Sequence, residues 1–236
     1  MCRLFGMISN QETDVDFSMN IAPQGKGAGF KAFIPGNPDG AGLGWYENGK
    51  AQLDKVGGSG DKEAVLSRHI NSKIVLSHVR YATTSNTSLE NAHPFRYKNF
   101  LFAHNGQVST ADVKNLLSPK YLDDLESNKS LKDSDSDSRF YFNLFLQNFE
   151  LLKDVEKSLI KTVQQLRQFK PKRLNFVFSD GKKLYAFKSV DGSTLHILKR
   201  NPSFESVYLE FTSKETGEML NSKGILGQKA VLVCSE

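Results

Sequence analysis

The amino-acid sequence predicts an α+β fold in which two antiparallel sheets carry helices on their outer faces. The expected elements run as strands, a helix, strands, a long helical stretch and strands again. No strand–helix alternation with a glycine-rich first turn is present, which argues against a doubly wound nucleotide-binding fold. Asn48-Gly49 and Asp180-Gly181 are hairpin signals between apolar runs, and hairpins join antiparallel strands. We expect one domain over residues 1–236.

The first half of the chain is predicted to be mostly strand. Asp61 is placed to cap a single helix that runs to about Asn71. The strands leading to residues 80 and 104 each end in a loop dense with polar side chains, residues 81–94 and 105–110. The strands expected in this half are Cys2–Ile8, Gly42–Tyr46, Ala51–Val56, Ile74–Arg80 and Phe100–His104.

The second half begins with an acidic, serine-rich stretch, residues 120–138, whose composition is typical of a loop. Apolar residues then recur every three or four positions from Phe142 to Leu166, which predicts an amphipathic helix that ends before Pro171. The strands expected after it are Leu174–Phe178, Leu184–Phe187, Leu195–Leu198, Val207–Phe211 and Ala230–Cys234.

Composition excludes several classes of function. The net charge is +5, but lysine and arginine are scattered among acids, which favours a solvated surface over a nucleic-acid footprint. The two cysteines stand at opposite ends of the chain, and no CxxC pair or other zinc spacing occurs. No apolar run approaches the ~18 residues of a membrane span, and no signal-peptide core is present. We expect a cytoplasmic protein without metal, cofactor, nucleic-acid partner or membrane partner.

Cys2 is the first residue with chemical potential, because it directly follows the initiator Met1. Removal of Met1 would give Cys2 a free α-amino group with a pKa of about 7.7–8.0, close to the ~8.5 of a thiol. One residue would then supply a nucleophile and a nearby base, as in N-terminal threonine enzymes. Taken alone, a cysteine in an apolar strand is more typical of a small buried side chain.

Three further segments carry polar residues at strand ends. Ser77–Ser85 contains Arg80, which suits either a substrate carboxylate or a structural ion pair. Asn91–Phe95 contains His93, a catalytic candidate that more typically braces a loop. Ala103–Gly106 ends in Asn105 and Gly106, whose side-chain amide and backbone N–H suit an oxyanion hole, although Asn-Gly alone is commonly a turn.

Together these motifs resemble those of the class II glutamine amidotransferases, in the same order along the chain. The match is closest to a stand-alone group that begins Met-Cys-Arg-Leu and contains a Pro-Asp-Gly…Gly-Trp-Tyr segment, here residues 1–4 and 38–46. It continues through His-x-Arg-Tyr-Ala-Thr, Asn-Ala-His-Pro-Phe and His-Asn-Gly. It then reaches Ser136-Asp137-Ser138, similar to Thr-Asp-Ser-Glu, and Cys234-Ser235-Glu236, similar to Ala-Ser-Glu.

The resemblance implies a four-layer αββα sandwich, the N-terminal nucleophile hydrolase fold, and hydrolysis of the glutamine side-chain amide. Cys2 would attack the amide and form a thioester, with Asn105 and Gly106 as the oxyanion hole. Arg80 would bind the α-carboxylate of glutamine and Asp137 its α-ammonium. Thr83, Thr84 and His93 are the other residues expected in the substrate-binding set.

The chain departs from the family pattern at two places. Ser85 stands where glycine is usual, and Arg139 replaces the acid of Asp-Ser-Glu. Asp135 is the alternative to Asp137 as the ammonium-binding acid, because both precede a serine.

Three readings remain for the function. The first is a glutaminase subunit that releases ammonia, with a separate synthetase as the acceptor. The second is an amidase for γ-glutamyl or other amides, and the third is a catalytically silent regulatory module. A metal site at His78, His93 and His104 is the weakest competitor, since their spacing matches no ligand pattern.

Overall fold

A computed structural model describes residues 2–14, 37–82, 86–122, 136–190, 194–200, 210–212, 219–221 and 228–235. Its larger sheet has six strands in the order β3-β2-β4-β1-β12-β9, all paired antiparallel. The first and last of the predicted strands, β1 and β12, are therefore neighbours. The strand bounds are β1 Arg3–Asp14, β2 Gly40–Glu47, β3 Lys50–Gly57, β4 Asn71–Val79, β9 His196–Arg200 and β12 Ala230–Cys234.

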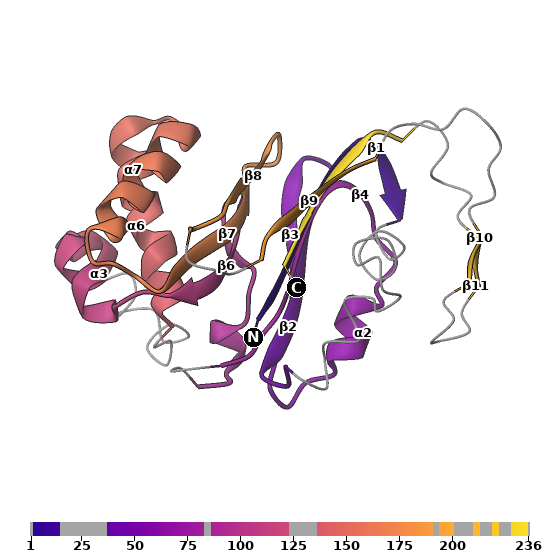
Figure 1. Ribbon diagram of the computed structural model, residues 1–236, viewed down its shortest axis with the longest axis horizontal. Helices are drawn as coiled ribbons and strands as arrows, with labels where there is room; N and C mark the ends of the chain where they lie inside the picture. Colours follow the sequence, from indigo (N-terminus) through magenta and orange to yellow (C-terminus); the bar gives the residue numbers. More distant parts are fainter. Residues whose placement is uncertain are drawn as a thin grey trace.

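The second sheet has four antiparallel strands in the order β5-β6-β7-β8. The predicted Asp180-Gly181 turn joins β7 to β8, with Gly181 at a φ of +87°. A separate antiparallel pair, β10 with β11, stands apart from both sheets (Figure 1). The strand bounds are β5 Phe95–Tyr97, β6 Phe100–Gln107, β7 Arg173–Ser179, β8 Leu184–Phe187, β10 Glu210–Thr212 and β11 Met219–Asn221.

The elements stack in four layers (Figure 1). Helices α3 (Thr110–Leu116), α6 (Asp137–Leu152) and α7 (Val155–Arg167) cover the outer face of the four-stranded sheet. The two sheets face each other, and α2 (Lys62–Leu66) lies on the far face of the six-stranded sheet. The predicted α+β fold with its αββα order of layers is confirmed.

The period-2 alternation of strand side chains produces the interfaces between these layers. On β1, Leu4 points between the sheets, whereas Phe5 and Met7 point toward α2. On β6, Leu101 and Ala103 point between the sheets, whereas Phe102 joins the aromatic core under α6. This alternation decides which polar residues at the strand ends face one another.

One helical prediction in each half of the chain needs correction. The helix after Asp61 ends at Leu66, well before Asn71, and Asn71 already belongs to β4. The long helical stretch is two helices, since Lys153 adopts a left-handed conformation with φ of 53° and Asp154 caps a new helix. The second helix ends at Arg167, before Pro171.

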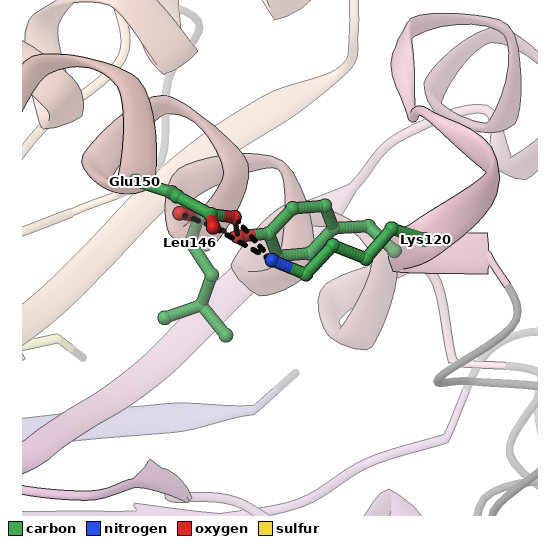
Figure 2. Close-up of polar contacts among 4 residues, drawn as sticks. Lys120, Leu146 and Glu150 are labelled. Atoms are coloured by element: carbon green, nitrogen blue, oxygen red, sulfur yellow. Dashed lines mark hydrogen bonds and ion pairs between the residues drawn. The ribbon is translucent and has the colours of Figure 1, made fainter.

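Helix α6 is tied to the segment that precedes it by an exposed polar cluster (Figure 2). The ammonium of Lys120 lies 2.7 Å from both carboxylate oxygens of Glu150, and the Tyr121 hydroxyl also donates to Glu150. The hydrogen bonds from Lys120 and Tyr121 hold the pKa of Glu150 below its ordinary value. Because water and salt screen exposed charges, we assign this cluster a minor part in stability.

Candidate active site

The register of β1 against β4 places Cys2 beside Arg80. Arg3 pairs with Val79, so the next pair along the ladder is Cys2 and Arg80. The Cys2 sulfur accepts a hydrogen bond from the Tyr81 N–H and donates to the Tyr81 carbonyl, both at 3.2 Å. Burial raises the pKa of the Cys2 thiol, against the lowering effects of the Tyr81 backbone and the Arg80 charge. The thiol form is therefore favoured here.

Asn105 reaches Cys2 from the other sheet. Its side chain continues the face of β6 that carries Leu101 and Ala103, and its Nδ2 donates to the Cys2 carbonyl at 2.8 Å. The strand runs on to Gln107, so Asn105-Gly106 lies within β6 and not in the predicted loop. A Cβ at Gly106 would overlap the Arg173 carbonyl oxygen on β7. Only glycine fits this close approach of two strands.

Arg80 is 4% exposed and is held by the segment that precedes β2. Its N–H donates to the Gly40 carbonyl at 2.8 Å and its Nη1 to the Asp39 carbonyl at 3.4 Å. The Asp39 N–H returns a bond to the Arg80 carbonyl at 3.3 Å, and the Asp39 carboxylate accepts from the Ala82 N–H at 2.7 Å. Asp39 is a site residue that we did not predict, although its Pro-Asp-Gly segment was recognised as a motif.

Asp137 begins α6 next to the end of β6. Its Oδ2 accepts a hydrogen bond from the Val108 N–H, and its Oδ1 accepts one from the Ser138 N–H, both at 2.8 Å. A carboxylate in the first turn is also favoured by the partial positive charge of the helix N-terminus. Four of the residues considered in the sequence, Thr83, Thr84, Ser85 and Asp135, lie outside the described residues.

His93 lies inside the molecule, 4% exposed. Its ring packs between His78 and Phe95, with a centroid distance of 4.4 Å to each. Burial lowers the pKa of both histidines, that of His78 to about 3, so both imidazoles are neutral. A Cβ at Gly42 would overlap the His93 carbonyl oxygen, so β2 lies directly against this loop.

Two basic side chains, Lys55 and Arg139, bind the backbone of the segment around His93. Lys55 donates to the Ala92 carbonyl at 2.9 Å. Arg139 donates to the Glu90 carbonyl at 3.1 Å, and its guanidinium lies 4.0 Å from the centre of the Phe95 ring. Burial and the Arg139 charge lower the pKa of Lys55 to about 7. No sequence signal marked Lys55, because its neighbours in space come from distant segments.

The described part of the chain holds no group of three or more His, Cys, Asp or Glu side chains arranged to bind a metal ion. Cys2 and Cys234 are both free thiols. Across the same residues, every helix is too short or too polar to span a bilayer.

Comparison with known proteins places these features in a family. The model for the class-II glutamine amidotransferases matches residues 1–235. An uncharacterized protein of Methanocaldococcus jannaschii is 28% identical over 225 residues, which cover 89% of this chain and 57% of that protein. The Escherichia coli protein named "Putative glutamine amidotransferase YafJ" is 27% identical, with 92% of this chain and 86% of that protein covered. The chain thus spans little more than half of the archaeal relative.

Solved structures show the same fold at lower identity. The crystal structure of a predicted glutamine amidotransferase from Pseudomonas aeruginosa PA01 has a TM-score of 0.58 at 22% identity and covers 98% of this chain and 88% of that one. The allosteric regulatory enzyme of purine biosynthesis has a TM-score of 0.60 at 17% identity, covering 100% of this chain and 42% of that one. These likenesses show a shared fold. The match of the family model to residues 1–235 identifies the chain as a member of the class-II glutamine amidotransferases.

Proposed function

We propose that this protein hydrolyses the side-chain amide of glutamine through a thioester on Cys2, once Met1 has been removed. The observation that carries the proposal is the contact between Cys2 and Asn105, which joins residues 103 positions apart on two different sheets. The register of β1 against β4 places the thiol beside Arg80, and Asp137 lies next to the end of β6, the strand that carries Asn105. A nucleophile, an amide donor and a cation thus meet around Cys2, and a carboxylate lies beyond the end of the strand that carries the amide donor.

The α-amino group of Cys2 is the base in this proposal. With a pKa near 8, it is close enough to the thiol to take the proton as the sulfur attacks the amide carbon. The C–N bond then breaks, the same proton passes to the leaving nitrogen, and ammonia departs. Water next cleaves the C–S bond of the thioester, which releases glutamate and restores the thiol. Because burial keeps the thiol protonated, this base is required at neutral pH.

Asn105 and Gly106 stabilise the oxyanion of the tetrahedral intermediate. The Asn105 amide carries two N–H donors, of which one is engaged by the Cys2 carbonyl. The second donor and the Gly106 N–H are the proposed oxyanion hole. Donors fixed on a strand before reaction need no reorganisation in the transition state, and removal of one such donor typically costs about 10²–10³ in kcat.

Arg80 and Asp137 bind the amino-acid end of glutamine in this proposal. The Arg80 guanidinium pairs with the α-carboxylate, and Asp137 with the α-ammonium. Thr83 and Thr84 follow Arg80 in sequence and lie outside the described residues, and we keep them as candidate ligands of the same carboxylate. Because the His93 ring is almost fully buried, we assign it to support of the loop beside glutamine rather than to hydrogen bonding with glutamine.

We extend the proposal to a separate synthetase subunit that accepts the ammonia. Co-purification followed by mass spectrometry tests for such a subunit.

The two cysteines provide a direct experiment. Intact-mass measurement first establishes whether the mature chain begins at Cys2. The purified protein is then assayed for glutamate and ammonia release from glutamine, and for labelling by a diazoketone analogue of glutamine. We expect one label per chain. The label should be lost in Cys2→Ala and kept in Cys234→Ala, because the Cys234 thiol is buried in the core and should not react.

The proposal is contradicted if a chain that begins at Cys2 neither releases ammonia from glutamine nor takes the label. Faster hydrolysis of γ-glutamyl anilides than of glutamine would instead favour the broader amidase. A retained Met1, without turnover, would favour the silent regulatory module.

A further inference from the structure

His104 lies next to the proposed oxyanion residue Asn105 on β6 but points the opposite way, because strand side chains alternate. Its ring is 1% exposed and faces the start of α6. There His104 Nδ1 lies 2.8 Å from the hydroxyl oxygen of Ser138. Ser138 is also buried, at 4% exposure. This contact joins the strand of the proposed oxyanion hole to the helix that carries Asp137.

Ser138 in turn holds the carboxylate of Asp137. Its hydroxyl donates to Asp137 Oδ1 at 3.3 Å, and its backbone N–H donates to the same oxygen at 2.8 Å. The Val108 N–H donates a hydrogen bond to Asp137 Oδ2 at 2.8 Å. Both oxygens are thus oriented by fixed donors, and one of these donors is itself fixed by His104.

The protonation state of His104 gives this chain of hydrogen bonds a direction. Burial lowers the pKa of His104, against the raising effect of the Asp137 charge, so the ring is neutral and carries one N–H. For the Ser138 hydroxyl to donate to Asp137, its oxygen must accept from Nδ1–H. Within the described chain Nε2 has no hydrogen-bond partner, although the Arg173 carbonyl lies near enough to raise the pKa of the ring. The competing tautomer would direct Nε2–H toward the nearby Arg173 carbonyl and reverse the first bond.

We propose that His104 and Ser138 are positioning residues that set the Asp137 carboxylate for the α-ammonium of glutamine. The proposal rests on the function proposed above and specifies how that site recognises its substrate. Neither residue touches the reacting atoms. Their effect reaches the substrate only through Asp137, so it should be confined to substrates that carry an α-ammonium group.

The test compares glutamine with glutaramate, the same molecule without its α-amino group. Loss of one hydrogen bond to a charged group should raise the KM for glutamine about tenfold in Ser138→Ala, with kcat changed by less than about threefold. The kcat/KM for glutaramate should stay at the wild-type value. Ser72→Ala, which removes another buried hydroxyl at the far end of β4, should show no such split between substrates.

A matched pair at His104 tests the direction of the chain. An asparagine amide nitrogen lies near the position of Nδ1, whereas a glutamine amide nitrogen lies near Nε2. His104→Asn should therefore keep the glutamine KM within about threefold of wild type, and His104→Gln should raise it about tenfold. Both variants must first show cooperative thermal unfolding, so that an unfolded variant is not read as a kinetic effect.

The outcomes separate this inference from the proposed function. A wild-type protein that hydrolyses neither substrate contradicts the function itself. If wild type hydrolyses glutamine but Ser138→Ala slows both substrates equally, His104 and Ser138 are ordinary core residues and the inference is wrong. The reverse order, with His104→Gln close to wild type and His104→Asn impaired, would overturn the proposed hydrogen-bond direction and with it the positioning chain.

Discussion

The carboxylate of Asp39 accepts a hydrogen bond from the backbone amide of Ala82, across 43 positions of sequence. The neighbouring main chain of Asp39 and Gly40 is bonded on both sides to Arg80. Asp39 therefore fixes the backbone on each side of the arginine that we propose to bind the substrate carboxylate.

Asp39→Ala should weaken glutamine binding, because the Ala82 N–H loses its partner and the backbone that follows Arg80 is no longer fixed. We expect kcat/KM for glutamine to fall about tenfold, mainly through KM. Asp39→Asn keeps an acceptor oxygen and should fall by a smaller factor. Steady-state ammonia release measures both. Equal activity of Asp39→Ala and wild type would contradict the role.

Ser235→Ala should destabilise the strand that carries Cys2. The Ser235 hydroxyl accepts from the Leu4 N–H at 2.8 Å, and the Ser235 N–H donates to the Leu4 carbonyl at 3.0 Å. Without the hydroxyl, a buried N–H is left unpaired, which should lower the free energy of unfolding by about 1–3 kcal/mol. Urea denaturation measures this, and Ser235→Thr, which keeps the hydroxyl, is the matched variant. A change below about 0.5 kcal/mol would show that water replaces the lost acceptor.

Gly42→Ala should impair both folding and activity, because the added methyl group overlaps the His93 carbonyl oxygen. Overpacking of this kind typically costs about 1–3 kcal/mol. Gly49→Ala is the control, since its Cβ meets nothing within 4 Å and the residue has only the strain of a φ of +73°. The midpoint temperature of thermal unfolding should fall in both variants, whereas turnover should be lost only in Gly42→Ala. If Gly49→Ala loses turnover to a similar extent, the loss in Gly42→Ala does not depend on the contact with His93.

The stability of the protein should depend on pH through Lys55. Its pKa is about 7 in the folded chain and about 10.4 when unfolded. In that window the unfolded chain holds a proton that the folded chain has released, so the free energy of unfolding rises with pH, by at most about 1.4 kcal/mol per pH unit. Lys55→Met should flatten this slope between pH 7 and pH 10 in urea denaturation, while Lys50→Met, on an exposed end of the same strand, should not. A slope unchanged in Lys55→Met would show that solvent reaches this ammonium.

Local signals predicted the fold well where one residue type forces a geometry. Asn48 and Gly49 both adopt positive φ in the predicted turn. The backbone prediction for the Asn105 segment was wrong, because the pairing of Asn105 with Asn175 on β7 continues the strand through an Asn-Gly pair that is usually a turn. Tertiary pairing of this kind has no local signature.

Other features depended on contacts that sequence alone does not reveal. The break between α6 and α7 comes at Lys153, whose left-handed conformation leaves the apolar periodicity on both sides intact. Arg139, which replaces a family acid, was noted as a departure, but its contact with the Phe95 ring joins segments 44 positions apart. The three-residue strand β5 was missed because it is too short for an alternating pattern, and the helix α3 was also missed.

The pairing of β1 with β12 has a consequence for the order in which the protein is assembled. The hydrogen bonds between Leu4 and Ser235 join residues 231 positions apart, so β1 gains one neighbouring strand, β4, long before the other, β12. During synthesis on the ribosome, one edge of β1 would stay unpaired and exposed until β12 emerged. Exposed strand edges of this kind are prone to aggregation. The proposed amidase activity should therefore arise only after β12 has paired with β1.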